Sequence, residues 1–418
     1  MALLRTMTAA ILMALVVGAC GGQNAGPGGG QVKLTDGKIV IGVINDQSGV
    51  YADLSGKNSV EAVNMAIADF KAKYGDNALG GPIEVITADH KNDPALASSK
   101  AQEFYERSNA DIILDVPTSS AALAIAKVAN DQKKLYINIT AATTDLTGSQ
   151  CNKYTFHYAY DTYMLAAGTG VWVTQNLGKK WYIIYPNYAF GQDMEKSFRG
   201  AVEKTGGTVV ASDGSPFPNQ TGDFSNLLLK ATNLKPEVLG AMQAGGDLVN
   251  VVKQYNQFKL KDQKIQLAIG LLFDTDITAL GSDAFAGVVY TTPWIWTMDE
   301  QSRAFADKFL QRTNIRPTFA HAGNYSAAFQ YLEAVRRAGT DDADAVVKQL
   351  EGYKFNDFFI RNGMIRPEDH WVMHDALLAQ VKPASEVKEK FDYSKVLGTL
   401  KADQVSRPLA DAGCKMAK

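Results

Sequence analysis

Two histidines near the end of the chain have a spacing that suggests metal chemistry. His370 and His374 are four residues apart, and Asp369 and Asp375 flank them. On a helix this spacing would place both imidazoles on one face, where they could hold a zinc ion. The run His-Trp-Val-Met-His lacks the glutamate of a metalloprotease, and it reads as a strand, in which the two rings would lie about 13 Å apart. We therefore expect no metal site here.

Motifs of nucleophilic and phosphate chemistry give no better candidate. The sequence contains no Gly-x-Ser-x-Gly elbow, no Gly-x-x-x-x-Gly-Lys loop and no Gly-x-Gly-x-x-Gly fingerprint. Ser385 and Lys388 match Ser-x-x-Lys, but no partner motif accompanies them. The sequence therefore predicts a protein that is not an enzyme, has no catalytic residues and needs no cofactor.

Composition limits the partners of the chain. Of 418 residues, 46% are hydrophobic and 21% are charged, and the net charge is −2. These are ordinary values for a globular protein, and the lack of a basic excess argues against a nucleic-acid partner. The length predicts two domains.

The first twenty residues have the pattern of an export signal. Arg5 precedes an apolar run from Met7 to Val17, which is short for a membrane span. The run ends in Val-Gly-Ala-Cys, which resembles the lipobox of bacterial lipoproteins and implies a lipid anchor on Cys20. The alternative is an ordinary cleaved signal with a chance cysteine. Residues 21–37, rich in glycine, are predicted to form a flexible tether.

Two further cysteines remain in the exported part of the chain. Cys151 and Cys414 form an even pair, for which one disulfide is the simplest state in an oxidising compartment. Such a bond would tie the C-terminal tail back to the first half of the chain. Two buried free thiols are the alternative.

Apolar strands and amphipathic helices alternate along most of the chain. The strands are predicted at 39–44, 83–88, 112–116, 135–139, 181–185, 208–210, 238–242 and 265–269. The helices are predicted at 63–75, 95–108, 120–130, 163–176, 191–204, 224–232 and 247–258. A return strand at 287–290, helices at 301–311 and 324–338, and a short antiparallel segment over 359–381 follow. This alternation predicts an α/β protein with two doubly wound parallel sheets.

Four segments lie at or directly after predicted strands, at 41–52, 117–121, 140–147 and 187–191. Their order and spacing resemble those of type I periplasmic binding proteins, in the Leu/Ile/Val group of ABC-importer receptors. The resemblance extends over residues 38–383. It implies two doubly wound lobes joined by a three-segment hinge. The implied division is a signal at 1–20, a tether at 21–37, lobe 1 at 38–157 plus 287–364, lobe 2 at 158–286 plus 365–383, and a tail at 384–418 tied back by Cys414.

In an open parallel sheet, ligands bind at the carboxyl ends of the strands. There the resemblance implies a seat for a carboxylate group, made by Thr118 and Ser119 at a helix start and by the small residues of a second loop, which are Ala141, Ala142 and Thr143. The alternative is that the hydroxyls only cap helices.

Aromatic side chains are expected to give the ligand site its shape. Tyr51 would come from the first lobe, and Tyr188 and Phe190 from the second. Tyr160 lies close to a predicted crossing between the lobes, where it would form either a wall of the site or part of the hinge packing.

Residues 270–274 bear on the class of ligand. Amino-acid receptors of this family hold the ligand ammonium with an acidic residue of the second lobe, and either Phe273 or Asp274 takes that place here. An inward Asp274 would favour an amino acid. An inward Phe273 would favour an aromatic or aliphatic carboxylate without an amine.

The function implied is that of an extracytoplasmic, lipid-anchored monomer that captures an amino acid or a related small carboxylate by hinge closure. It would deliver the ligand to the permease and ATPase subunits of an ABC importer. A sensory receptor of the same fold is an alternative, and an exported hydrolase is a weaker one.

Overall fold

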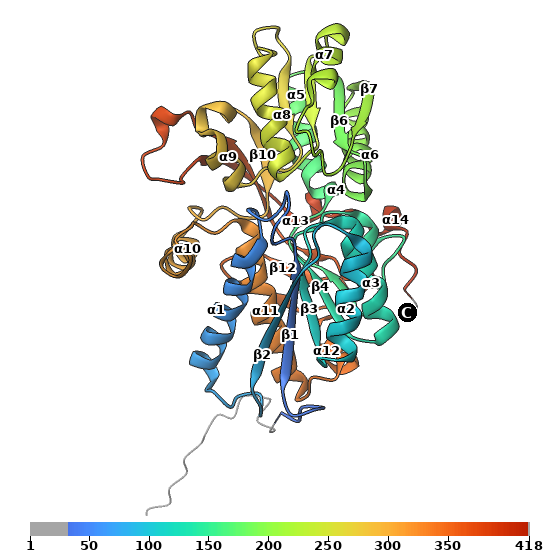
Figure 1. Cartoon of the computed structure of the whole chain (residues 1–418), viewed down its shortest axis with the longest axis vertical. Helices are drawn as coiled ribbons and strands as arrows, with labels where there is room; N and C mark the ends of the chain where they lie inside the picture. Colours follow the sequence, from blue (N-terminus) through green and yellow to red (C-terminus); the bar gives the residue numbers. More distant parts are fainter. Residues whose placement is uncertain (1–31, 417–418) are drawn as a thin grey trace, which may run out of the picture. The chain divides into compact units, whose positions relative to one another are not determined.

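The computed structural model describes residues 32–416, and these belong to one compact unit. The predicted export signal, Cys20 and most of the predicted tether lie outside the described residues. Figure 1 shows two sheets, one at each end of this unit, with helices packed on both faces of each.

The first sheet is parallel and has the strand order β2-β1-β3-β4-β5. Its strands are β1 (Ile39–Asn45), β2 (Ile83–Asp89), β3 (Ile112–Asp115), β4 (Leu135–Asn138) and β5 (Thr155–His157). Helices α1 (Gly56–Tyr74) and α11 (Phe319–Ala338) pack together on one side, and α2 (Pro94–Glu106) and α3 (Ser119–Gln132) pack together on the other. We call this sheet and its helices the first lobe; α10 (Glu300–Thr313) and α12 (Ala343–Leu350) belong to it as well.

The second sheet is also parallel, with the order β7-β6-β8-β9. Its strands are β6 (Lys180–Pro186), β7 (Thr208–Ser215), β8 (Val238–Ala241) and β9 (Gln266–Ile269). Its helical segments are α4 (Thr162–Leu165), η2 (Ala166–Gly170), α5 (Val171–Asn176), α6 (Ala189–Lys204), α7 (Ser225–Leu234), α8 (Gly245–Gln257), α9 (Asp274–Leu280) and η3 (Ser282–Phe285). We call this group the second lobe.

Two small antiparallel sheets complete the fold. One has the order β10-β14-β15, with β10 (Val289–Thr292), β14 (Ala376–Val381) and β15 (Ser394–Leu400). The other joins β11 (Lys354–Phe355), β12 (Gly363–Ile365) and β13 (Val372–Met373). The remaining short helices are η1 (Thr144–Thr147), η4 (Ala384–Glu386), α13 (Ala402–Val405) and α14 (Leu409–Ala412).

Three segments connect the lobes. The chain leaves the first lobe between β5 and α4, returns between β10 and α10, and leaves again between β13 and β14. The side chains of β10 and β14 pack into the core of the second lobe. The residues at which each lobe begins and ends, as predicted from the sequence, stay a prediction.

Alternation along β1 explains how one strand serves two cores. Ile39, Ile41 and Val43 face the core beneath α1 and α11, whereas Val40 and Ile44 face the core beneath α2 and α3. All seven residues of the strand are buried, as expected for a parallel sheet covered on both faces. The continuous apolar run in the sequence has this cause.

The C-terminal tail contacts both lobes. β15 pairs with β14, and α13 packs against α4 and η2 of the second lobe. Further along, Cys414 is joined to Cys151 of the first lobe by a disulfide. The tail therefore connects the second-lobe side to the first lobe by a covalent bond.

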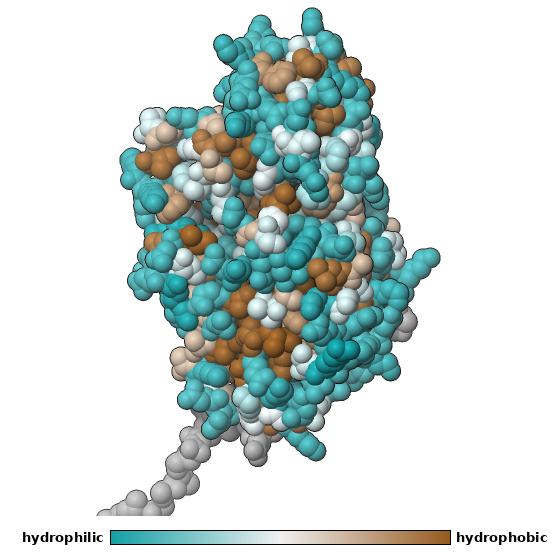
Figure 2. All heavy atoms as spheres, viewed as in Figure 1, coloured by the Kyte–Doolittle hydropathy of each residue, from teal (hydrophilic) through white to brown (hydrophobic). Residues whose placement is uncertain are grey.

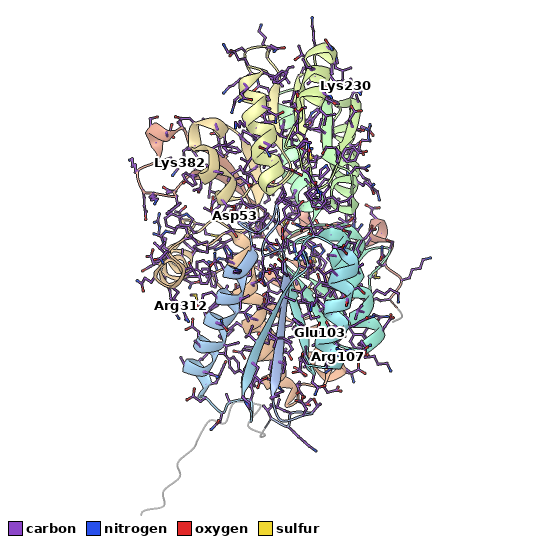
Figure 3. All side chains as sticks on the ribbon, viewed as in Figure 1. Asp53, Glu103, Arg107, Lys230, Arg312 and Lys382 are labelled. Atoms are coloured by element: carbon purple, nitrogen blue, oxygen red, sulfur yellow. A yellow bond between two sulfur atoms is a disulfide. The ribbon has the colours of Figure 1, made fainter. Side chains whose placement is uncertain are left out.

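The face shown in Figure 2 is mostly polar. Hydrophilic residues cover most of it, and hydrophobic residues gather near the partly exposed edge strand β2. Among the labelled charges in Figure 3, Lys230 lies near one end of the unit and Asp53 lies between the two sheets. None of the helices in residues 32–416 combines the length and the apolar composition that a membrane span needs.

Candidate functional site

Every strand of the first sheet ends in a polar residue. The register aligns these residues along one edge of the sheet: Asn45, Asp89, Asp115, Asn138 and His157. In open α/β sheets this carboxyl edge is where ligands bind. The polar row therefore marks the edge at which a site is expected.

Asp115 connects three of the loops that start at this edge. Its carboxylate accepts a hydrogen bond from Asn45 Nδ2 at 2.9 Å and another from the Thr140 hydroxyl. Asn45 precedes the loop that carries Tyr51, and Thr140 begins the loop after β4. The Asp115 side chain is fully buried, and burial raises the pKa of its carboxyl. One buried carboxyl thus holds three loops in register.

The backbone at this point is strained. Asp115 has φ of 80° and Val116 has φ of 67°, in the left-handed region that β-branched residues rarely adopt. Each such conformation costs roughly 1–3 kcal/mol and persists only where the surroundings enforce it. The turn places Pro117 against the cavity described below and starts α3 two residues later.

The start of α3 leaves hydrogen-bond donors free. Within residues 32–416, the backbone N–H groups of Ser119 and Ser120 have no acceptor, and the buried Ser119 hydroxyl has no partner. The Thr118 hydroxyl instead donates to Asn92 Oδ1 and does not cap the helix. A helix start with unpaired donors favours a negative charge.

The loop after β4 is shaped by two residues of the polar row. Asn138 Nδ2 donates to the Ala141 carbonyl at 2.7 Å, and His157 Nε2 contacts the same carbonyl at 2.8 Å. Among the described residues, no acceptor faces the N–H groups of Ala142 and Thr143. The Thr143 hydroxyl accepts from the backbone of η1, which is a helix-capping role.

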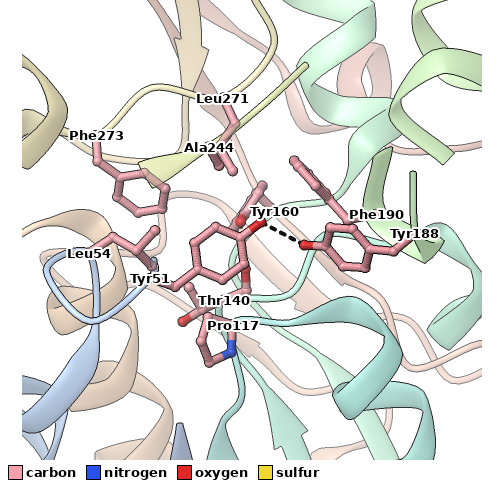
Figure 4. Close-up of a pocket in the computed structure, with 10 residues that line it drawn as sticks. All are labelled: Tyr51, Leu54, Pro117, Thr140, Tyr160, Tyr188, Phe190, Ala244, Leu271 and Phe273. Atoms are coloured by element: carbon pink, nitrogen blue, oxygen red, sulfur yellow. Dashed lines mark hydrogen bonds between the residues drawn. The ribbon is translucent and has the colours of Figure 1, made fainter. Parts of the chain in front are cut away.

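A cavity lies between these loops and the second lobe. Figure 4 shows its lining, which includes Tyr51, Tyr160, Tyr188, Phe190 and Phe273. The other lining residues are Leu54, Pro117, Thr140, Ala244 and Leu271. Not one of the ten lining side chains carries a formal charge at neutral pH.

The cavity is small. Its volume is about 220 Å³, part of which is open to solvent. Sites for drug-sized ligands are larger, at roughly 300–1,000 Å³. The site as it stands in this structure therefore suits a small ligand, and a drug-sized ligand would require the two walls to separate.

Contacts between the lobes hold the walls together. The hydroxyls of Tyr51 and Tyr188 share a hydrogen bond of 2.7 Å (Figure 4), and Gly246 N donates to the Val50 carbonyl at 3.2 Å. A Cβ on Gly245 would lie 2.4 Å from that carbonyl, and its φ is +56°. Only glycine at this position permits so close an approach.

A second contact between the lobes lies beside η1. Thr144 of the first lobe donates its backbone N–H to Asp193 Oδ2 of α6 at 2.7 Å, and its hydroxyl also contacts this carboxylate. Thr162 of the second lobe donates to the same oxygen at 2.7 Å. The bonds from Thr144 join the two lobes, whereas the bond from Thr162 lies within the second lobe.

Phe273 and Asp274 have different surroundings. Phe273 lines the cavity and stacks on Phe319 of α11, with ring centroids 4.3 Å apart. Asp274 is half-buried outside the lining, where burial and the neighbouring Asp392 raise the pKa of its carboxyl to about 7. Asp276 caps α9 by accepting from Phe273 N at 3.0 Å, and burial raises its pKa to about 7.

The structure brings together five of the eleven residues predicted for ligand binding. Tyr51, Tyr160, Tyr188, Phe190 and Phe273 line the cavity. The other six lie outside its lining, namely Thr118, Ser119, Ala141, Ala142, Thr143 and Asp274. Except for Asp274, these lie in the loops next to the lining residues Pro117 and Thr140.

Sequence reasoning did not assign five residues of the lining. Pro117 and Thr140 directly precede predicted loop residues, so the strand ends signal them. Ala244 and Leu271 follow predicted strands of the second sheet and carry the same signal. Leu54 has no signal in the sequence.

The two histidines first considered as metal ligands have other partners. His370 Nε2 contacts Glu351 at 3.1 Å, and His374 Nε2 contacts the Ala159 carbonyl at 2.8 Å. In the described part of the chain, no group of three or more histidine, cysteine, aspartate or glutamate side chains converges as a metal site.

Known proteins share this architecture. A profile of the periplasmic binding protein family matches residues 38–387. The chain belongs to the periplasmic binding protein family. The predicted resemblance and the predicted type I fold with its two doubly wound lobes are thereby confirmed, and the family places the protein outside the cytoplasm.

Several relatives of this periplasmic binding protein are similar over most of their length. A crystal structure of a periplasmic binding protein from Burkholderia mallei is 39% identical, covers 92% of this chain and 100% of its own, and has a TM-score of 0.87. A branched chain amino acid ABC transporter periplasmic ligand-binding protein from Burkholderia xenovorans is 34% identical, with coverages of 90% and 99% and a TM-score of 0.79. The Leu/Ile/Val-binding protein homolog 3 of Brucella melitensis is 26% identical over 327 residues, which are 76% of this chain and 84% of that protein. These relatives are solute-binding proteins.

Proposed function

We propose that this protein is the substrate-binding component of an ABC importer and that it captures a small carboxylate without an ammonium group. One observation carries the choice of ligand: Phe273 lines the cavity, whereas Asp274 does not. A buried ammonium without an acidic partner is costly, because it loses its hydration. The uncharged second-lobe wall therefore disfavours an amino acid and suits the apolar part of an organic acid.

The first lobe supplies groups that suit the acid end of such a ligand. The free N–H groups at Ser119 and Ser120 lie at the positive end of a 14-residue helix, and the Ser119 hydroxyl has no partner among the described residues. At the neighbouring strand end, the N–H groups of Ala142 and Thr143 also lack an acceptor in the described part of the chain. Together they form a donor set for a carboxylate, with Thr118 and Ala141 as supports.

Closure is the mechanism by which the ligand is captured. A guest between Tyr51 of the first lobe and Phe273 of the second contacts both only when the lobes are shut. Such a guest stabilises the shut form by the contacts that the open form lacks. The importer then recognises the shut form, so the protein needs no chemical step and is not an enzyme.

The wider setting follows from the family and the sequence. We infer a monomer that works with the permease and ATPase subunits of its importer and is held at a membrane by acyl chains on Cys20. An amino acid is the second candidate ligand, which the Burkholderia xenovorans and Brucella melitensis relatives favour through what their names say they bind. A sensory receptor would have the same site but a different docking partner.

A thermal-shift screen of residues 31–418, whose described part forms one compact unit, tests this proposal. The ligands are matched sets: L-leucine, 4-methylpentanoate and 3-methylbutylamine, and L-phenylalanine, 3-phenylpropanoate and 2-phenylethylamine. A ligand at 100 times its Kd adds about 2.7 kcal/mol to the free energy of unfolding. We expect the acids to raise Tm more than the amino acids, and the amines to have no effect. Stabilisation by the amino acids alone would contradict the choice of ligand.

A further inference from the structure

A third aromatic ring covers the two tyrosines that join the lobes. Phe217 stacks on Tyr188 with centroids 3.9 Å apart and an interplanar angle of 19°, and on Tyr51 with centroids 5.5 Å apart and an angle of 29°. Tyr51 belongs to the first lobe, whereas Phe217 and Tyr188 belong to the second. Phe217 is half-buried and is not part of the cavity lining. It therefore packs on the Tyr51–Tyr188 pair without lining the space for the guest.

The loop that carries Phe217 is anchored on the second lobe. Prolines flank the ring at positions 216 and 218, which restricts the backbone on both sides. Asn219 N donates to Asp247 Oδ2 at 3.3 Å, and Asn187 N donates to the Ser215 carbonyl at 2.7 Å. The second of these bonds joins the Phe217 loop to the loop of Tyr188. The ring is thus positioned before the lobes meet.

We propose that Phe217 is a gate that slows release of the ligand by packing over the Tyr51–Tyr188 hydrogen bond when the lobes shut. The contact between Phe217 and Tyr51 exists only in the shut form, because the two rings come from different lobes. The ring also shields the hydroxyl pair from water, which strengthens a hydrogen bond. The proposal rests on the proposed function, and it assigns to the site a residue that controls how long the ligand stays.

This role has a kinetic signature. The ligand meets the open form, in which Phe217 does not touch the first lobe, so the association rate does not depend on the ring. Release requires opening, which breaks the contact with Tyr51. Loss of the ring should therefore raise the dissociation rate and leave the association rate nearly constant. A general packing defect would instead lower Tm without raising the dissociation rate relative to the association rate.

Stopped-flow measurements on residues 31–418 with 3-phenylpropanoate and L-phenylalanine test the gate. We expect Phe217→Ala to raise the dissociation rate about tenfold, which corresponds to 1.4 kcal/mol, and to change the association rate by less than threefold. The dissociation rate of Phe217→Leu should lie between those of Phe217→Ala and the wild type. The leucine variant keeps the test possible if the alanine variant does not fold. Val210→Ala is the matched control, because Val210 is an exposed side chain on the strand before the same loop. A dissociation rate within twofold of the wild type in both Phe217 variants would overturn the gate.

A second readout needs no ligand. Spin labels at Lys127→Cys on α3 and Leu229→Cys on α7, both exposed, report the distance between the lobes. Phe217→Ala should increase the share of the longer distance, and an unchanged distribution would overturn the gate. Failure of the wild type to bind any acid or amino acid would instead count against the proposed function, so the two failures are distinguishable.

Discussion

The two walls of the cleft are built on different chemical principles. The first-lobe wall consists of Tyr51, Leu54, Pro117 and Thr140, and the loops next to it carry backbone N–H groups that have no acceptor within residues 32–416. The buried carboxyl of Asp115 fixes these loops by hydrogen bonds to Asn45 and Thr140. The second-lobe wall presents Phe190, Ala244, Leu271 and Phe273, which offer shape but no charge. Both walls stand at the carboxyl ends of parallel sheets, so the fold sets only their place. The residue types that follow each strand set what the wall recognises.

This difference implies a division of labour between the lobes. The first wall requires accurate placement, because hydrogen bonds depend on geometry, and it uses a buried polar network and a strained turn to obtain it. The second wall requires only a complementary apolar surface, which tolerates small shifts. Substitutions should therefore act through stability and position on the first wall, and through ligand class on the second.

The largest effect is expected beneath the first wall. Asp115→Ala leaves the donors of Asn45 and Thr140 without their acceptor in a fully buried place. Each orphaned buried donor costs about 1–3 kcal/mol, so the free energy of unfolding should fall by roughly 3 kcal/mol. Urea denaturation checks this value. The free energy of unfolding should fall less in Asp115→Asn, because asparagine keeps the shape of the side chain and one acceptor oxygen. Equal stability of the alanine variant and the wild type would show that Asp115 does not hold the loops.

The second wall is tested by placing a charge in it. Phe273→Asp puts a carboxylate where the proposed ligand packs its apolar part, so we expect roughly 100-fold weaker binding of 3-phenylpropanoate at pH 8, or about 2.7 kcal/mol by calorimetry. Asp274→Asn is the matched control, because Asp274 does not line the cavity, and it should change Kd by less than twofold. If Asp274→Asn lost most of its affinity for 3-phenylpropanoate and Phe273→Asp kept its affinity, the roles of the two residues would be reversed.

A smaller effect is expected where the walls meet. Tyr188→Phe removes only the hydroxyl that bonds to Tyr51 at 2.7 Å and keeps the ring. A hydrogen bond of this kind contributes about 1 kcal/mol, so Kd should rise roughly fivefold. Calorimetry with the same acid checks this ratio, and Tyr51→Phe should give a similar value, since it removes the other partner. If the two variants differed by tenfold or more, one hydroxyl would have a second role.

The support of the second wall should depend on pH. Asp276 accepts from Phe273 N, and burial raises the pKa of its carboxyl to about 7, above the ordinary value of 3.8. Between these values the native state binds more protons than the unfolded state, so this group lowers stability as pH rises from 4 to 7. Asp276→Asn cannot ionise. The stability of the variant minus that of the wild type, measured as the free energy of unfolding in urea, should therefore be larger at pH 8 than at pH 5. A difference independent of pH would contradict the assignment.

Much of the fold could be predicted from the sequence. Runs such as 39–44 and 181–185 are apolar on both faces and are separated by amphipathic helices, which indicates covered parallel strands. The pairing of β10 with β14 could not be predicted in the same way, because two antiparallel strands about 90 residues apart leave no local signal in the sequence.

The site was predicted in part, for a physical reason. Loops at strand ends point to a ligand edge, and aromatic residues such as Tyr51 and Tyr188 are natural walls. The choice between Phe273 and Asp274 depends on one backbone turn at the start of α9, which sequence cannot resolve. Leu54 lies three residues after the predicted Tyr51, on the same loop, but nothing in its own residue type marks it. Phe217 is held by its own lobe, and only the packing of the two lobes brings it against Tyr51, which the sequence does not reveal.

Calorimetric titration of residues 31–418 with L-phenylalanine and 3-phenylpropanoate, or with the leucine pair if it gives the larger thermal shift, tests the central claim most directly. The two ligands of each pair differ only in the ammonium group. An uncharged second wall predicts that the acid binds at least tenfold more tightly than the amino acid. Tighter binding of the amino acid would contradict the account, because it would require an acidic partner that the cavity lining does not contain.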